Sequence, residues 1–497
     1  MGLVIRQSLV TSLISYAGVI IGYVNLLYLF PRFLSPDQVG LLRTIQDTAI
    51  LFTPFAQFGI TQTIIRYFPQ FGKEKSQSGS FITLMLLLAL TGFSIFFMVF
   101  TLFRNGITSY FEANASEFIA YASLTIWLTL ILLLTSVLEA YSRSLLKTVI
   151  PSLLREVVVR IFFAVLVVAY YLGYLSYDQF IMSSIGGYVL CLGLLVYYLW
   201  RSGDFQLNLD FSILKTTTPG RMVRYSLLGF AGTAGMIIIG KMDSLMVSGM
   251  IGLSANAVYT TAFYMATVIE IPKRALSQLT MPLISRAFEK NDMKEINILY
   301  QKTAIHQLII GSLLLLGVAA NLPSIFALMP RSEVYQAGYY VVLIIGAAKL
   351  VDMLFGPSSE IIVLSKYYAF NIVLIMLLAG MTIVMNLIFI PRYGIEGAAY
   401  GAALSLIVFN VIKFIFIWSR LSLQPFSGSF FKVLLIAGVT WAVHIFLPRF
   451  EATILDIMVR SAAMTIVFGS LIWWSQVSPE SNELLKKGLG ALGLRAK

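Results

Sequence analysis

The chain has 497 residues, of which 58% are hydrophobic and only 12% are charged. Soluble proteins carry about 25% charged residues to cover their surface, so this composition excludes an ordinary soluble domain and favours a protein largely surrounded by lipid. The formal net charge is +12. Because cytoplasmic loops of membrane proteins collect lysine and arginine, we interpret this charge as a membrane-topology signal and expect no nucleic-acid partner.

Apolar windows of about 20 residues, the length that crosses a bilayer, predict about fourteen transmembrane helices. They lie near residues 8–30, 40–60, 81–103, 118–138, 156–175, 180–200, 225–248, 256–280, 303–322, 337–356, 370–390, 396–418, 431–447 and 455–475. Helices are expected throughout, since an isolated strand cannot satisfy its backbone groups in lipid. The fold class is therefore an all-α integral membrane protein.

The positive charges give this arrangement a direction. If the first residues are cytoplasmic, most lysines and arginines fall in cytoplasmic segments, and the outside loops hold few. Those few are Arg32, Arg104, Arg331, Arg392 and Arg449. This bias predicts that both termini are cytoplasmic and that the number of spans is even. The segment 479–497 is amphipathic and is expected to lie on the inner leaflet.

Two distant stretches of the chain resemble each other. Arg6-Gln7-Ser8-Leu9 is matched by Arg224-Tyr225-Ser226-Leu227, and the same offset aligns Tyr23 and Asn25 with Lys241 and Asp243. The offset also carries Pro54 onto Pro272, and both prolines fall inside predicted spans. Duplicated membrane units of this kind are typical of transporters, and Pro54 and Pro272 become candidate hinges.

Signatures of enzymes are missing from the sequence. It contains no Walker loop, and its two histidines, His306 and His444, are too far apart for a metal-ligand motif. No nucleophile constellation stands out, and a glycan polymerase or ligase would need a large outside loop that the predicted topology lacks. We therefore expect neither an enzyme nor a metal site nor a cofactor.

Charged residues inside the predicted spans are the candidate functional groups, because such residues are costly in lipid and usually face a cavity or pair with each other. They are Arg43 and Asp47 in the second span, Lys241 and Asp243 in the seventh, Glu270 in the eighth, and Lys349 and Asp352 in the tenth. Asp47 and Lys241 are expected at a similar depth, where they could share one water-filled space.

A structural alternative stays open for these charges. Arg43 with Asp47, and Lys349 with Asp352, could be ion pairs within one helix that only hold the bundle together. Glu270 is followed closely by Lys273 and Arg274, which suits a residue near the inner surface. Three further cations lie near predicted span ends and are expected to reach the headgroups. They are Arg160, Lys413 and Arg460.

The segment Leu29-Phe-Pro-Arg-Phe-Leu-Ser-Pro-Asp-Gln-Val-Gly40 resembles the turn between the first two spans of bacterial polysaccharide-export flippases. The run from Asp243 to Pro282 is similar to their seventh and eighth spans. These flippases form the oligosaccharidyl-lipid branch of the multidrug/oligosaccharidyl-lipid/polysaccharide exporter superfamily. The resemblance implies two six-helix lobes in a parallel pseudo-twofold repeat plus two C-terminal helices. The expected divisions are residues 1–215, 216–420 and 421–478, followed by the tail 479–497.

The resemblance also implies a function. Family members move an undecaprenyl-diphosphate-linked oligosaccharide from the cytoplasmic to the periplasmic leaflet of the bacterial inner membrane by alternating access, for O-antigen, capsule or another surface polysaccharide, and a polysaccharide polymerase is an expected partner. The expected substrate-binding residues are Asn25, Arg43, Lys241 and Lys349. The acids that could bind a coupling H⁺ or Na⁺ are Asp47, Asp243, Glu270 and Asp352. The alternatives are a cation-coupled multidrug exporter of the same superfamily and a lipid II flippase.

Overall fold

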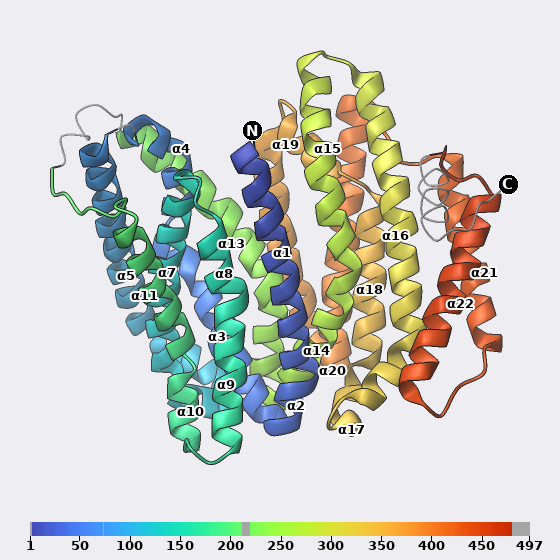
Figure 1. The fold of residues 1–497 in the computed structure, drawn as a ribbon, viewed down its shortest axis with the longest axis horizontal. Coiled ribbons are helices and arrows are strands. Elements are labelled where there is room, and N and C mark those ends of the chain that lie inside the picture. The colour runs from blue at the N-terminus through green and yellow to red at the C-terminus, as the bar shows by residue number, and fades with distance from the viewer. Residues whose placement is uncertain (1, 73, 211–218, 480–497) are drawn as a thin grey trace. The chain divides into compact units, whose positions relative to one another are not determined.

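The computed structural model describes residues 2–72, 74–210 and 219–479, and in these ranges all regular structure is helical (Figure 1). The chain divides into two compact units, unit 1 up to Val258 and unit 2 from Tyr259. The division falls within the helix α14. An all-helical membrane protein, as the sequence predicts, is confirmed. The predicted amphipathic tail, from residue 480 onward, lies outside the described residues.

Unit 1 is built around α3, which packs against α5, α7 and α13. Its helices are α1 (Gly2–Val24), η1 (Asn25–Leu29), α2 (Phe30–Phe33), α3 (Pro36–Gln57), α4 (Ile60–Phe71), α5 (Lys75–Glu112), α6 (Ser116–Ala120), α7 (Ala122–Ser144), α8 (Val149–Leu153), η2 (Leu154–Val158), α9 (Val159–Tyr171), α10 (Tyr177–Ser183), α11 (Gly186–Arg201), α13 (Pro219–Met250) and the start of α14 (Leu253–Thr267). The serine and glutamine of a capping box, Ser35 and Gln38, fix the start of α3.

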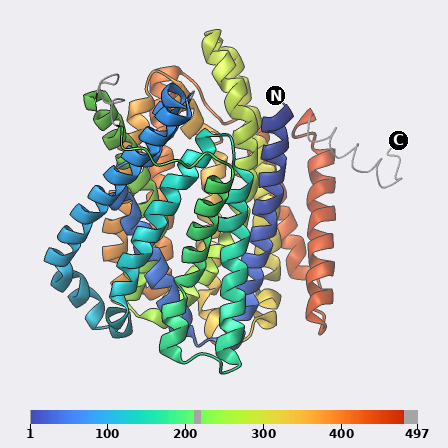
Figure 2. The ribbon, with the colours of Figure 1, turned by 60° about the vertical axis from the view of Figure 1, so that its left-hand side comes forward.

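In unit 2 the long helix α16 packs against α15, α18, α21 and α22. The helices of this unit, after the end of α14, are η3 (Val268–Glu270), α15 (Ile271–Glu289), α16 (Met293–Leu328), α17 (Ser332–Tyr335), η4 (Gln336–Gly338), α18 (Tyr339–Leu354), α19 (Ser358–Leu364), α20 (Tyr368–Leu421), α21 (Gly428–Phe446) and α22 (Thr453–Trp474). The helices α21 and α22 run side by side as an antiparallel pair (Figure 2).

By length and composition, the described residues contain 10 helices that could each cross a membrane, or up to 11 if one bent pair is counted. This count does not confirm the predicted fourteen. One difference is α20, whose 54 residues include the non-helical Gly394. A side chain at Gly401 would come within 2.5 Å of Asn386 Oδ1, so the helix reverses at Gly394 and its two arms pack together. These arms correspond to the predicted spans 370–390 and 396–418.

Both candidate hinge prolines lie beside a helix break. Pro54 is in the last turn of α3, before Phe58 and Gly59 adopt left-handed conformations, and α3 and α4 meet there at a bend of 49°. Ser226 of α13 donates a hydrogen bond to the Phe58 carbonyl (2.6 Å). Pro272 begins α15, directly after the 3₁₀ segment η3. Their role as hinges stays a prediction.

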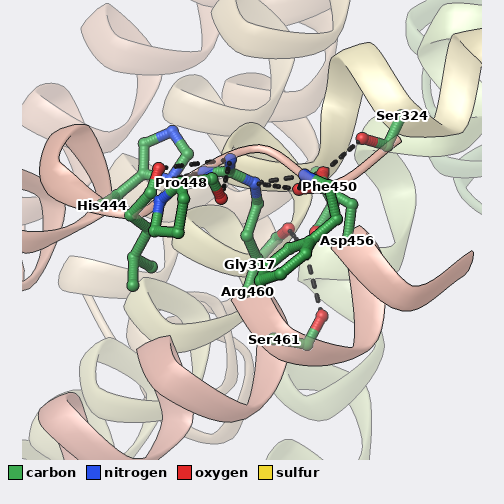
Figure 3. Close-up of polar contacts among 10 residues, drawn as sticks. Gly317, Ser324, His444, Pro448, Phe450, Asp456, Arg460 and Ser461 are labelled. Atoms are coloured by element: carbon green, nitrogen blue, oxygen red, sulfur yellow. Dashed lines mark hydrogen bonds and ion pairs between the residues drawn. The ribbon is translucent and has the colours of Figure 1, made fainter. Parts of the chain in front are cut away.

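Buried Arg460 fastens the α21–α22 pair to α16 (Figure 3). Its Nε contacts both carboxylate oxygens of Asp456 at 3.1 Å, and its terminal nitrogen donates to the carbonyl of Pro448 (3.0 Å) in the connecting loop. Asp456 in turn accepts from Ser324 of α16 (2.7 Å). The expectation that Arg460 reaches the headgroups is wrong, because a local acid and loop carbonyls satisfy its donors inside the protein.

Candidate functional site

The candidate site in unit 1 centres on an ion pair between α3 and α13. Lys241 Nζ lies 2.6 Å from Asp47 Oδ1, and Ser244, one turn along α13, donates to Asp47 Oδ2 (2.7 Å). The Lys241 side chain is 20% exposed whereas that of Asp47 is 6% exposed. The acid is thus held inside the protein, while part of the lysine side chain is exposed.

A polar network extends from this pair to α14. Ser244 Oγ lies 2.9 Å from Asn256 Oδ1, and Asn256 Nδ2 donates to Thr44 Oγ1 (3.2 Å). Thr44 Oγ1 also lies 2.7 Å from Ser248 Oγ. These residues recur every three or four positions on α3 and α13, which puts them on one face of each helix. Sequence reasoning missed the network, because hydroxyl and amide groups are common in membrane helices.

The other predicted site residues of unit 1 are Arg43, Asp243 and Asn25. The first two are near the Lys241–Asp47 pair in sequence, and Asn25 is on another helical segment. Arg43 is half-buried, one turn before Asp47 on α3. Asp243 is buried on α13, next to Ser244. The amide of Asn25 is buried elsewhere and donates to the carbonyl of Arg160 in α9 (2.8 Å). Asp47 and Lys241 are thus two predicted residues of unit 1 that the structure joins directly.

Unit 2 holds a second set of ion pairs. Lys349 of α18 lies 2.5 Å from Glu270 of η3, and Asp352, one turn further along α18, pairs with Lys273 of α15. The structural alternative in which Lys349 and Asp352 pair with each other is wrong, since each finds its partner on the neighbouring segment. Glu270 also has the exposed Arg274 at 3.7 Å.

Two cations of this second set were missed or misplaced by sequence reasoning. The sequence places Lys273 near the inner surface without a partner, and the structure pairs it with buried Asp352. Lys413 was expected to reach the headgroups, but it is only 1% exposed. It donates to Ser359 Oγ (3.1 Å) and faces the Phe409 ring at 4.4 Å. The expectation is wrong, because the ammonium group is held inside the protein by these contacts.

Two lysines that the sequence predicts as substrate-binding residues thus pair with carboxylates that it predicts as cation-binding residues. Lys241 is held by Asp47 and Lys349 by Glu270. Such pairs can exchange partners: an anionic ligand would take over the lysine, and a small cation would take over the carboxylate. Among the described residues, no group of three or more His, Cys, Asp or Glu is placed to hold a metal ion.

Residues 4–288 match a family described as "Polysaccharide biosynthesis protein". This match covers more than half of the chain, and the chain belongs to this family. It is a multi-pass membrane protein, as its helices and its relatives indicate.

Two relatives come from archaea. An uncharacterized membrane protein of Methanocaldococcus jannaschii is 21% identical over 416 residues, covering 80% of this chain and 81% of that protein. A probable low-salt glycan biosynthesis flippase, Agl15 of Haloferax volcanii, is 22% identical over 279 residues, covering 53% of this chain and 58% of that protein.

Among solved structures, the chain is similar to the lipid II flippase MurJ in an inward closed conformation. The TM-score is 0.75 at 13% identity, over 95% of this chain and 100% of that chain. An inward-facing multidrug resistance MATE family transporter of the MOP superfamily gives a TM-score of 0.62 at 15% identity, over 84% and 94% of the two chains. These likenesses show that the chain has the fold of this superfamily.

Proposed function

We propose that the protein is a flippase for a polyprenyl-diphosphate-linked oligosaccharide, which it moves from the cytoplasmic to the outer leaflet. The observation that carries this proposal is the intramembrane pair of Lys241 with Asp47, in which the lysine is partly accessible and the acid is not. The family, the named glycan flippase among the relatives and the fold of a lipid II flippase support the same class of substrate.

A lipid-linked oligosaccharide needs a protein to cross the membrane. A diphosphate and its sugars cannot enter hydrocarbon without losing their hydrogen bonds to water, which is costly. Lysines on membrane helices offer the diphosphate replacement partners, while the polyprenyl tail stays in the bilayer. Lys241 and Lys349 are the proposed diphosphate contacts, with Arg43 and Asn25 as further candidates. Alternating access, in which the carrier opens to one side of the membrane at a time, would then expose the head group to each side in turn.

The acids supply the coupling in this proposal. When the diphosphate binds Lys241, Asp47 loses its partner and becomes free to bind a proton or Na⁺. Glu270 stands in the same relation to Lys349, while Asp352 and Asp243 are further cation-binding candidates.

Localisation and partners belong to the same proposal. The protein would reside in the cytoplasmic membrane with both termini inside, as the positive charges predict. It would deliver the translocated lipid-linked oligosaccharide to a polysaccharide polymerase. Cysteines introduced at Arg104 and Arg420, labelled from either side of the membrane, would test this orientation.

Transport in proteoliposomes tests the proposal. The purified protein is reconstituted with a fluorescent lipid-linked oligosaccharide, and transfer between leaflets is followed by quenching from outside. Lys241→Met should lower the rate at least tenfold, because the diphosphate loses a charged contact worth about 1.5–3 kcal/mol. Lys147→Met is the matched control, since Lys147 pairs with Asp204 in a loop segment and should transport normally.

The same assay separates the alternatives. Equal rates for Lys241→Met and the wild type would exclude Lys241 as a substrate contact. Selective transport of lipid II would identify a lipid II flippase. Transport of organic cations, without any lipid-linked glycan, would overturn the proposal in favour of a multidrug exporter.

A further inference from the structure

A group of buried polar side chains in unit 2 takes no part in the ion pairs described above. Within the described residues, these side-chain atoms are buried without a hydrogen-bond partner: Ser277 Oγ, Tyr300 OH, both amide atoms of Gln307, Ser312 Oγ and Ser358 Oγ. Gln307 has 0% exposed surface. More than about nine in ten buried polar groups in proteins are hydrogen-bonded, to protein or to ordered water. The cluster therefore points to a ligand that supplies the missing bonds.

Ser277 lies on α15, and Tyr300, Gln307 and Ser312 lie on α16. These two helices pack together as a hairpin with a short turn (Figure 1). Thr280 Oγ1 on α15 lies 3.3 Å from Thr303 Oγ1 on α16. Because the helices are antiparallel, the next turn back along α15 faces the next turn forward along α16. These turns carry Ser277 and Gln307, so two of the unsatisfied groups are brought together.

One end of the row reaches the Lys273–Asp352 pair. Lys273 lies one turn before Ser277 on α15, and Gly311 lies one turn after Gln307 on α16. A Cβ at Gly311 would come 2.8 Å from Sδ of Met353, the residue next to Asp352. Ser277 is therefore one helical turn from Lys273, whose ammonium group pairs with the buried carboxylate of Asp352.

The other end lies near the start of α16. A Cβ at Gly356 would be 2.9 Å from Cβ of Ala304, which brings the turn before α19, and with it Ser358, beside Tyr300 and Thr303. The negative charge of Glu360 acts on the Tyr300 hydroxyl. The unsatisfied groups thus form a row from Tyr300, two turns inside α16, to Asp352.

We propose that this row holds a file of internal water molecules that relays protons between the start of α16 and Asp352. Hydroxyl and amide groups are neutral and can both donate and accept hydrogen bonds, which suits water better than an ion. A buried water needs two to four polar partners, and the row supplies them at successive turns. The predicted topology places the start of α16 on the cytoplasmic side, so the Tyr300 end of the file would be the end nearer the cytoplasm.

The relay itself moves one proton and breaks no other bond. A proton enters at the Tyr300 end, each water passes one proton on, and the Asp352 carboxylate gains one and releases Lys273. The charged groups that act on Asp352 are Lys273 on α15, Lys413 on α20 and Lys349 on its own helix. Glu270 and Glu360 act on Lys273. Ser277, Gln307 and Tyr300 position the waters. The relay rests on the proposed function, but the presence of the waters does not.

Radiolytic footprinting in lipid nanodiscs tests for the waters, because X-ray pulses generate hydroxyl radicals from bound water that oxidise adjacent methionines. Met353 and Met464 form a matched pair in unit 2, with exposures of 0% and 1%, but Met464 belongs to an apolar cluster. Met353 should be oxidised several-fold faster than Met464. In Gln307→Leu, or in Ser277→Ala if the first variant does not fold, the rate at Met353 should fall toward that of Met464. Equal rates in the wild-type protein would overturn the inference.

Transport kinetics test the relay separately. Gln307→Leu should lower the maximal transport rate several-fold and leave the half-saturating substrate concentration unchanged, since the lipid does not contact Gln307. A Gln307→Leu protein with wild-type rates at every pH would overturn the relay. A wild-type protein that labels at Met353 but transports no lipid-linked glycan would overturn the proposed function and leave the water file standing.

Discussion

Gly18 and Gly22 lie one turn apart on α1, yet a methyl group at each would meet different neighbours. At Gly18 a Cβ would come 2.6 Å from the backbone oxygen of Glu156, whereas at Gly22 the nearest atoms are at the mobile end of Arg160, 3.3 Å away. We predict that Gly18→Ala destabilises the protein by about 1–3 kcal/mol, the usual cost of overpacking. Gly22→Ala should be nearly neutral, because alanine is also the better helix former.

Thermal unfolding of the two variants in the same detergent checks this prediction, and each serves as the other's control. The midpoint should fall for Gly18→Ala and stay within the error of the wild type for Gly22→Ala. Equal midpoints would mean that α1 does not pack on Glu156 as closely as the structure indicates.

Single residues also show how far the sequence could predict the site. That Asp47 and Lys241 lie at a similar depth follows from span positions, and the structure places them in contact. The partners of Lys349 and Asp352 could not be predicted, because sequence spacing reveals neighbours on one helix but not those on another. The 3₁₀ segment η3 brings Glu270 to Lys349, and the local sequence does not predict that segment.

At the level of elements, helices were predicted well and their ends less well. The apolar pattern gives α20 as two spans, and the structure connects them through Gly394 without an intervening loop. Lys413 was misplaced for another reason: Ser359 of α19 and the Phe409 ring hold its ammonium group inside the protein. The rule that charges near span ends reach the headgroups fails where groups of the protein itself bind the charge.

The pair α21–α22 offers a test of a buried charge at the scale of an element. Arg460 and Arg274 each pair with an acid four residues earlier in the sequence, but their side chains are 3% and 73% exposed. Arg460→Ala leaves Asp456 buried without its main partner, so we predict a loss of about 3–5 kcal/mol. Arg274→Ala should cost at most about 0.5 kcal/mol. Thermal unfolding measures both losses, and limited proteolysis should show faster cleavage in the 447–452 loop of Arg460→Ala.

A double variant distinguishes the charge from the packing. Replacing both partners, as in Arg460→Met with Asp456→Leu, removes the unpaired charge and should recover most of the lost stability. A double variant as unstable as Arg460→Ala would show that the loop carbonyls of Leu447 and Pro448, and not the ion pair, hold the hairpin.

At the scale of the whole molecule, the composition and the positive charges were enough to predict a multi-pass helical membrane protein, and the family match over residues 4–288 confirms the predicted family. The number of spans was less predictable, because a broken helix such as α3–α4 passes a test of length and hydropathy only when its two parts are counted together. The division into lobes at residues 215 and 420 stays a prediction. The ion pairs within each unit, however, allow a prediction for the proposed transport cycle as a whole, namely how substrate binding and cation binding affect each other.

In the proposed mechanism, the pair of Lys241 with Asp47 sets the sign of the coupling between substrate and cation. Each ligand must break the same ion pair, so whichever binds first removes that cost for the other, and the effect is reciprocal. We expect the affinity for a short-chain polyprenyl diphosphate to rise at least about 5-fold, the lower end of typical couplings, when the coupling cation is raised to saturation. Titration calorimetry at several Na⁺ concentrations and pH values measures this rise. In Asp47→Asn the affinity should be high and independent of the cation, whereas Asp204→Asn, which removes the acid of the loop pair with Lys147, should behave as wild type. A wild-type affinity for the diphosphate that falls as the cation concentration rises would contradict this prediction. It would mean that the two ligands compete for one site, so that only one of them can separate Lys241 from Asp47 at a time.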